Sequence, residues 1–167
     1  DVHVGGEDLV FPHHENEIAQ SQAATGEQFA TYWLHVSLLE TGGEKMSSSL
    51  QNFFTVKNAL EEFGVNSIRM FLLSTAYRHK QTYSEAALDE ALQRWDRLER
   101  AYDRAIEAID SPDAYATVTD STLRKAVETQ EAAFRQAMND DFNTREAIAA
   151  LLEIAGSINT HVDGRDR

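Results

Sequence analysis

The chain has 167 residues, of which 42% are hydrophobic and 26% charged, a composition typical of a soluble globular protein. No apolar run approaches the roughly 20 residues of a membrane span, and no basic-then-apolar start indicates a secretory signal. The chain contains no cysteine, which excludes disulfides and thiolate metal ligands within it. We therefore expect a cytoplasmic protein with no membrane partner.

The formal net charge of −13 is evidence against nucleic-acid binding, because proteins that bind nucleic acids usually carry a basic surface. A high-salt cytoplasm would reconcile the two, since an acidic surface keeps a protein soluble and salt shortens the reach of charge. The alternative is simply an acidic protein. The chain opens on Asp1 with the pattern of the middle of a domain, so we expect a longer parent protein.

The first part of the chain mixes short strand and helix patterns. Val2 and Val4 alternate around His3, which predicts a strand running into the Gly5–Gly6 turn. The segments that follow are a helix from about Pro12 to Ala24 ended by Gly26, a strand around Trp33–Leu38, a polar loop at Glu44–Ser49, and helices near Val56–Phe63 and Ser67–Ser74.

From Ser84 onward the sequence predicts long amphipathic helices with apolar residues every three or four positions. Three such stripes begin at Leu88, Leu123 and Ile148. Asn143 is placed to cap the third helix, with Glu146 in the capping-box position. We predict a mostly α chain with a small α/β part, divided into residues 1–82 and an antiparallel helical bundle of residues 83–167.

One candidate metal site lies in the predicted first helix. On a helix, His13 and Glu17 share one face a single turn apart, and zinc accepts both imidazole and carboxylate. On the same assumption, His14 points elsewhere. Zinc needs about four ligands, so a complete site requires others from outside the chain. A bare pair at this spacing is also common for purely structural reasons.

Two further segments suit a nucleotide. Glycines after a strand let backbone approach a ligand, and the acid in Gly5-Gly6-Glu7-Asp8 suits a ribose hydroxyl. Lys45, among the small hydroxyl residues of Glu44–Ser49, suits a phosphate clamp. Each pattern alone also fits an ordinary turn or a solvated loop.

The order of these pieces resembles one family. The run from Asp1 through Pro12-His13-His14-Glu15-Asn16-Glu17 to Ser21 closely resembles the second active-site segment of cysteinyl-tRNA synthetases. Lys45–Ser49 resembles the KMSKS loop of class I synthetases, and Met138–Thr144 resembles the entry to the last helices of the DALR-type domain. The resemblance implies the distal part of a Rossmann-type catalytic domain with a stem-contact region, followed by a tRNA-binding helical domain.

The resemblance also implies a cysteine–tRNA ligase that uses ATP with Mg²⁺, cysteine and tRNA(Cys). By motif position, His13 and Glu17 would be two ligands of a zinc ion that binds the substrate thiolate, with two upstream cysteines completing the site. Thiolate binds zinc far better than a serine hydroxyl does, so discrimination is large. The chain alone would be inactive.

For the nucleotide, the resemblance implies that Gly6 and Asp8 bind adenosine and that His3 lies near the substrate carboxylate or the metal. Lys45 would steady the triphosphate, and Ser47 and Ser49 would shape the closing loop. Ser48 stands where the family usually has a second lysine, which removes one positive charge.

Arginines spaced by three and four residues mark the first long helix as a candidate tRNA contact; these are Arg94, Arg97, Arg100 and Arg104. The alternative is a solvated face paired with neighbouring acids. For the whole chain, two alternatives stay open: the mycothiol-pathway ligase that joins cysteine to an amino sugar, and a non-catalytic helical module that binds tRNA or protein.

Overall fold

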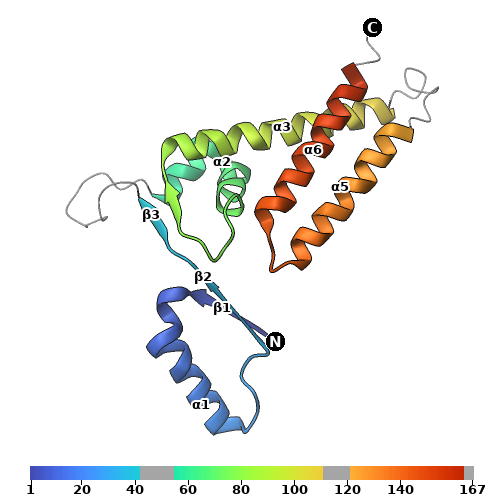
Figure 1. Ribbon diagram of the computed structural model, residues 1–167. Helices are drawn as coiled ribbons and strands as arrows, with labels where there is room; N and C mark the ends of the chain where they lie inside the picture. Colours follow the sequence, from blue (N-terminus) through green and yellow to red (C-terminus); the bar gives the residue numbers. More distant parts are fainter. Residues whose placement is uncertain (42–54, 111–120, 164–167) are drawn as a thin grey trace. The chain divides into compact units, whose positions relative to one another are not determined.

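The computed structural model describes residues 1–41, 55–110 and 121–163, and Figure 1 shows these as coloured ribbon. The described residues divide into two compact units. The first comprises residues 1–41 and 77–84, and the second comprises residues 55–76, 85–110 and 121–163. None of the helices in these ranges combines the length and apolarity that a membrane crossing requires.

The first unit is built on a strand–helix–strand segment. β1 (Val2–Gly6) leads through a short helical turn, Glu7–Leu9, and a turn at Val10–His14 in which Phe11 is extended, into α1 (Glu15–Thr25). β2 (Tyr32–Val36) then returns beside β1. The strands are parallel, in register from Val2 opposite Tyr32 to Gly6 opposite Val36. Gly26, with φ of 73°, ends α1 in the left-handed conformation. The predicted strand, helix and glycine stop are confirmed.

Alternation along the two strands separates the faces of this small sheet. His3 and Trp33 pair across the strands, and Gly5 pairs with His35, so these four residues share the face toward α1. The opposite face carries Val2, Val4, Tyr32 and Val36, which are 40% to 65% exposed. The polar and aromatic residues of interest therefore lie on one side of the sheet.

A second pair of parallel strands completes the first unit. β3 (Leu39–Thr41) pairs with β4 (Gln81–Tyr83), and the Ser37 amide donates to the Tyr77 carbonyl over 2.8 Å. The sequence did not predict these strands, because three residues are too few for a periodic pattern. Lys80 and Glu40 form an ion pair of 2.7 Å beside them. The hydrogen bond and charge of Glu40 raise the pKa of Lys80.

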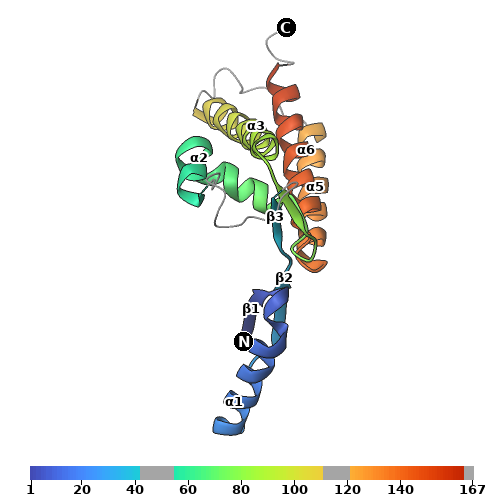
Figure 2. The same cartoon turned by 90° about the vertical axis from the view of Figure 1, so that its left-hand side faces the viewer.

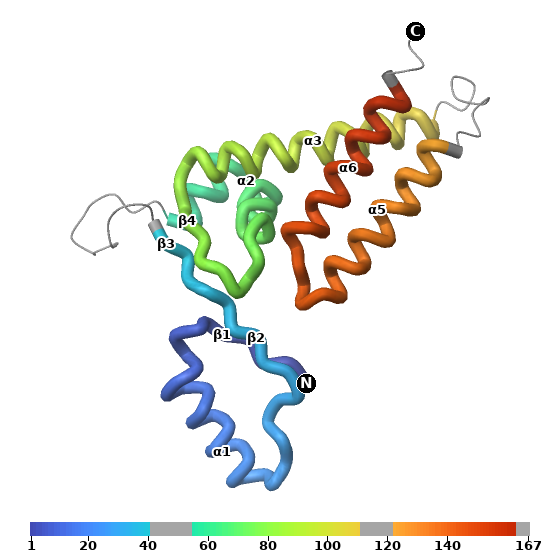
Figure 3. Tube along the Cα trace, in the orientation of Figure 1, coloured from blue at the N-terminus to red at the C-terminus, as the bar shows by residue number. Residues whose placement is uncertain are grey.

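Four described helices make the second unit: α2 (Val56–Leu73), α3 (Glu85–Asp110), α5 (Ser121–Asn139) and α6 (Thr144–Asp163). α3 packs against α2 and α6, and α5 packs along α6 in the antiparallel sense (Figures 1 and 2). The three predicted amphipathic helices are confirmed as α3, α5 and α6. The tube in Figure 3 follows the reversal from α5, in orange, into α6, in red.

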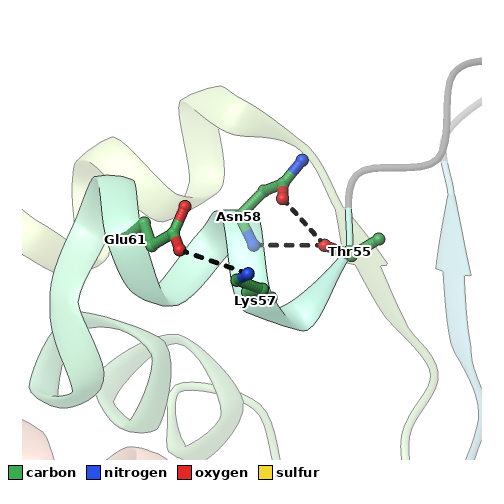
Figure 4. Close-up of polar contacts among 4 residues, drawn as sticks. All are labelled: Thr55, Lys57, Asn58 and Glu61. Carbon is green, nitrogen blue, oxygen red and sulfur yellow. Dashed lines mark hydrogen bonds and ion pairs between the residues drawn. The ribbon is translucent and has the colours of Figure 1, made fainter.

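α2 contains the two helices predicted for this region. Gly64 separates them, because its φ of 74° and ψ of 162° lie outside the helical range. Thr55 caps its start, since the Thr55 hydroxyl accepts from the Asn58 amide over 3.1 Å (Figure 4). An exposed Lys57–Glu61 contact follows one turn later.

The core of the second unit explains a difference from the predicted boundary at residue 82. Leu88 is 1% exposed, and Phe63, Met70 and Phe71 of α2 are also buried where α2 packs on α3. This apolar face makes α2 part of the helical unit, although α2 precedes the predicted boundary. After the 77–84 segment of the first unit, the chain enters the second unit again at Glu85, where α3 begins, close to the predicted boundary.

The turn between α5 and α6 contains the predicted helix cap. The Glu146 amide donates to the Asn143 side chain over 3.3 Å, which confirms Asn143 as the N-cap of α6. The Asn143 amide donates to the Ala137 carbonyl of α5 over 3.0 Å. Asp141 and Phe142 adopt left-handed φ values of 53° and 55° within this turn. Asn143 therefore joins the end of α5 to the start of α6.

Candidate functional site

Three side chains of the first unit converge on the α1 side of the sheet. One ligand atom from each of His3, His14 and Glu17 lies within 4.8 Å of the other two. His3 Nε2 and Glu17 Oε2 are 2.9 Å apart. His14 is buried, His3 is half-buried and Glu17 is exposed, so the cluster opens to solvent on its carboxylate side.

The local fold explains why these residues meet. His3 lies at the centre of β1 and faces α1, while His14 closes the turn that delivers the chain into α1. Glu17 follows His14 by three residues, which on a helix puts both side chains on one face. Gly5 leaves the room that the His14 ring needs, because a Cβ at position 5 would lie 2.6 Å from His14 Nε2.

The structure brings His14 into the group with Glu17, and His13 is not a member of that group. His14 is 5% exposed, whereas His13 is exposed and lies outside the convergent group. The face argument from sequence assumed a regular helix from Pro12, but Phe11 just before it is extended, with φ of −130° and ψ of 133°, and α1 begins only at Glu15. The expectation that His14 points elsewhere is thus wrong, and the metal role of His13 stays a prediction.

Aromatic rings enclose the histidines. Trp33 lies 4.6 Å from His3 and 5.3 Å from His14 between ring centroids, and Phe29 lies 5.1 Å from His3. His35 stacks on Trp33 and shares a hydrogen bond of 2.9 Å between its Nε2 and His14 Nδ1. Sequence reasoning missed His14, Trp33 and His35. The strand alternation that places His3 would also have placed Trp33 and His35, given the register.

The donor set of the cluster fits a zinc ion. Two neutral imidazoles and one carboxylate are zinc ligands, and three protein ligands leave a position for a further donor. His14 Nδ1 shares a hydrogen bond with His35, and such a contact at one ring nitrogen orients the ring of a histidine that binds a metal through the other. Among the residues that the structure describes, this is the one place where three or more side chains that could bind a metal converge.

Of the residues predicted to bind the nucleotide, the structure describes Gly6 and Asp8. Gly6 ends β1, and the exposed Asp8 lies in the turn that follows. The Asp8 carboxylate folds back over Gly6, so that a Cβ at position 6 would collide with it. This is the carboxyl end of a parallel strand, where such sheets bind ligands. Lys45, Ser47 and Ser49 lie outside the described residues.

The arginines of α3 make contacts inside the helical unit. Arg97 donates to the Leu152 carbonyl over 3.2 Å, and Arg104 donates to the Asn159 side chain over 3.0 Å, both across to α6. Arg94 donates to the Ser74 hydroxyl over 3.3 Å and contacts Glu90. The Arg94–Glu90 pair fits the alternative of a face paired with neighbouring acids, and the contacts with α6 give Arg97 and Arg104 a structural role. Arg100 is exposed.

Comparison with known proteins identifies the family. The family model described as tRNA synthetases class I (C) catalytic domain matches residues 1–93, more than half of the chain. The chain belongs to the class I (C) tRNA synthetases. A second model, the DALR domain, matches residues 133–167, which include the end of α5 and all of α6. The resemblance drawn from the motifs is confirmed by both matches.

Relatives named cysteine–tRNA ligase match this class I (C) chain over nearly its whole length. The protein of Haloarcula marismortui is 65% identical over 99% of the chain, that of Halobacterium salinarum 63% identical over 99%, and that of Caldicellulosiruptor saccharolyticus 42% identical over 98%. The chain covers 34%, 34% and 35% of these proteins, so it spans about a third of the relatives' length.

Solved structures of other synthetases share the fold. LeuRS of Agrobacterium radiobacter K84, solved in a ternary complex with tRNA and LeuAMS, matches 98% of the chain and 23% of its own with a TM-score of 0.74 at 16% identity. A putative arginyl tRNA synthetase of Campylobacter jejuni matches 98% of the chain and 39% of its own with a TM-score of 0.64 at 11% identity. At identities this low the two matches show a shared fold alone, and that fold agrees with the predicted fold class.

Proposed function

We propose that the chain is the part of a cysteine–tRNA ligase that completes its catalytic domain, at residues 1–82, and supplies its DALR-type tRNA-binding domain, at residues 83–167. The observation that carries the proposal is the convergence of two imidazoles and a carboxylate within 4.8 Å, on a segment matched by a class I (C) catalytic-domain model. The DALR match favours a tRNA ligase over the mycothiol-pathway ligase.

The proposed reaction begins with cysteine and ATP, which give cysteinyl-adenylate and pyrophosphate, and ends with transfer of the cysteinyl group to the terminal adenosine of tRNA(Cys) with release of AMP. A bound zinc ion would supply a soft ligand position that accepts a thiolate and disfavours a hydroxyl. The imidazoles would hold the ion in the buried part of the cluster, and Glu17 would close it on the exposed side.

The nucleotide half of the proposal rests on the carboxyl end of β1. Gly6 lets the adenosine approach the backbone, and the exposed Asp8 carboxylate accepts hydrogen bonds from the ribose hydroxyls. Lys45 would stabilise charge on the triphosphate, with Mg²⁺ as its partner, and Ser47 and Ser49 would shape the loop. His3 would remain at the metal cluster rather than at the adenosine, because it contacts Glu17.

The test of this proposal measures zinc content and cysteine–tRNA formation in the full-length protein. We expect one zinc per molecule, lost together with aminoacylation in Glu17→Ala and in whichever of His13→Ala and His14→Ala removes a ligand. His79→Ala is the matched control, because His79 is an exposed histidine of the same unit outside the cluster. The 167-residue chain alone should charge no tRNA.

A protein that binds no zinc, or that keeps its zinc in all three variants, would contradict this assignment and favour the non-catalytic module. Loss of zinc in His14→Ala alone would replace His13 by His14 as the ligand. Loss in His13→Ala alone would mean that His13 turns toward Glu17 when the remaining ligands are present.

A further inference from the structure

One exposed turn carries the lysine and arginine side chains of the first unit. Among the described residues of this unit, Arg78 and Lys80 are the only side chains of these two types, and both are exposed, as is His79 between them. They stand against seven carboxylates, those of Asp1, Glu7, Asp8, Glu15, Glu17, Glu27 and Glu40. Within the described part of this unit, a polyanionic ligand therefore meets lysine or arginine charge only at this turn.

Backbone hydrogen bonds fix the place of the turn at both of its ends. The Ser37 amide donates to the Tyr77 carbonyl over 2.8 Å. The Gln81 amide donates to the Leu38 carbonyl over 3.2 Å. Residues 37 and 38 join β2 to β3, and Figure 3 shows the chain running directly from one strand into the other. The basic turn is thus attached to the junction that follows β2.

This junction lies at the carboxyl edge of the small parallel sheet. Val36, the last residue of β2, pairs with Gly6, the last residue of β1. The pKa of Lys80 is raised by the hydrogen bond and charge of Glu40 and, more weakly, by the charge of Glu7, which directly follows Gly6. The Lys80 ammonium is therefore within electrostatic reach of the edge at which parallel sheets bind ligands.

The two cations are held in ways that suit a phosphate group. The Arg78 Cζ lies 4.9 Å from the centre of the Tyr77 ring, a cation–π contact that orients the planar guanidinium. A guanidinium stacked in this way can donate from its edge, since its N–H groups lie in its own plane. The Lys80 ammonium lies 2.7 Å from the Glu40 carboxylate, and the two side chains are 57% and 49% exposed. A forked donor and a point charge are the groups that bind phosphate oxygens.

We propose that the Arg78–Lys80 turn binds a phosphate group of the substrates at the carboxyl edge of the β1–β2 sheet. This inference rests on the proposed function, which supplies two sources of phosphate, the triphosphate of ATP and the phosphodiester chain of tRNA. The shared chemistry is an oxyanion that accepts hydrogen bonds from a guanidinium and an ammonium. Glu40 competes with the phosphate for Lys80, because both anions bind the same ammonium.

The experiment measures the affinities of the full-length protein for ATP, by calorimetric titration, and for tRNA(Cys), by filter retention. Arg78→Gln and Lys80→Gln should each weaken the binding of one of these ligands by about 10-fold, as expected for the loss of a hydrogen bond to a charged group. Arg135→Gln is the matched control, because Arg135 is also an exposed cation paired with a glutamate, Glu131 on α5. It should leave both affinities unchanged.

Glu40→Gln separates phosphate binding from a structural role of the Lys80–Glu40 pair. If the pair only joined β3 to β4, Lys80→Gln and Glu40→Gln would have the same effect, because each removes the same contact. In phosphate binding, Glu40→Gln removes a competing negative charge, so this variant should bind the ligand at least as tightly as the parent protein. Salt gives a second readout, since loss of one phosphate contact lowers the slope of log affinity for tRNA against log salt by about 1.

The two ligands distinguish the sources of the phosphate. Weaker binding of ATP assigns the turn to the triphosphate, and weaker binding of tRNA with a lower salt slope assigns it to the tRNA backbone. Parent affinities for both ligands in Arg78→Gln and Lys80→Gln would overturn the inference, as would equal losses in Lys80→Gln and Glu40→Gln. A full-length protein that binds both ligands but forms no cysteinyl-tRNA refutes the proposed function, and the binding measurements still decide the role of the turn.

Discussion

The absence of a side chain at Gly5 leaves the space that the His14 ring occupies. Substitution of Gly5 by alanine therefore tests whether the position of that ring matters. A Cβ at position 5 would lie 2.6 Å from His14 Nε2, well inside van der Waals contact. The backbone of Gly5 lies in an extended strand, so alanine is tolerated there except for this collision. His14 must therefore move away in Gly5→Ala, and overpacking of this kind costs about 1–3 kcal/mol.

We predict that Gly5→Ala weakens zinc binding in the full-length protein on the order of 10-fold. Gly6→Ala is the matched control, because its Cβ would meet the Asp8 carboxylate and not His14. Gly6→Ala should spare zinc and weaken ATP binding, as measured by calorimetric titration with ATP. Zinc affinity that falls equally in both variants would show that the two glycines maintain only the strand, contrary to this prediction.

Part of the site was predictable from residue types and part was not. The sequence named Glu17 because its spacing from His13 suits one face of a helix, and it named His3 through the resemblance to the synthetase segment. It placed His13 rather than His14 in the group with Glu17, because it assumed a regular helix from Pro12, whereas α1 begins only at Glu15, after an extended Phe11. It missed Trp33 and His35, since the register that brings β2 beside β1 is a tertiary property.

At the scale of elements, the start of α6 depends on one side chain. The Asn143 side chain accepts from the Glu146 amide, while the Asn143 backbone amide donates to the Ala137 carbonyl at the end of α5. Replacing a capping asparagine by alanine typically costs about 1 kcal/mol. That energy corresponds to about a 5-fold change in the equilibrium for opening the first turn.

We predict that Asn143→Ala speeds hydrogen exchange of the first amides of α6 about 5-fold and leaves the middle of α3 unchanged. Asn143→Asp is the control, because aspartate also caps and adds a favourable negative charge at a helix N-terminus. Exchange by mass spectrometry on peptides containing residues 144–150 measures the effect. Faster exchange in Asn143→Asp of the same size would rule out the capping explanation.

The helices were predictable because a long period averages over local exceptions. The stripes beginning at Leu88, Leu123 and Ile148 each repeat over several turns, and each forms one helix. β3 and β4 have three residues each and no repeat to detect. Gly64 has the sequence signature of a helix stop, and it separates the two helices that the sequence predicted within α2.

At the scale of the whole molecule, the charge of −13 is the dominant electrostatic fact. Acidic residues repeat along the exposed side of α3, where Glu99, Asp103 and Glu107 follow one another at intervals of four. Like charges at this spacing destabilise a helix by about 0.2–0.5 kcal/mol per pair. Salt weakens this repulsion, because the screening length falls from about 10 Å at 0.1 M to about 3 Å at 1 M.

We predict that raising KCl from 0.1 M to 1 M increases the thermal unfolding midpoint of the full-length protein by a few degrees, on the order of 1 kcal/mol. The increase should be smaller in the triple variant Glu99→Gln, Asp103→Asn, Glu107→Gln, whose midpoint at low salt should already be higher. Circular dichroism at 222 nm, which follows the helices, measures both. Parallel salt dependences in the parent and the triple variant would mean that α3 repulsion is not the source, and that salt acts through burial of apolar surface instead.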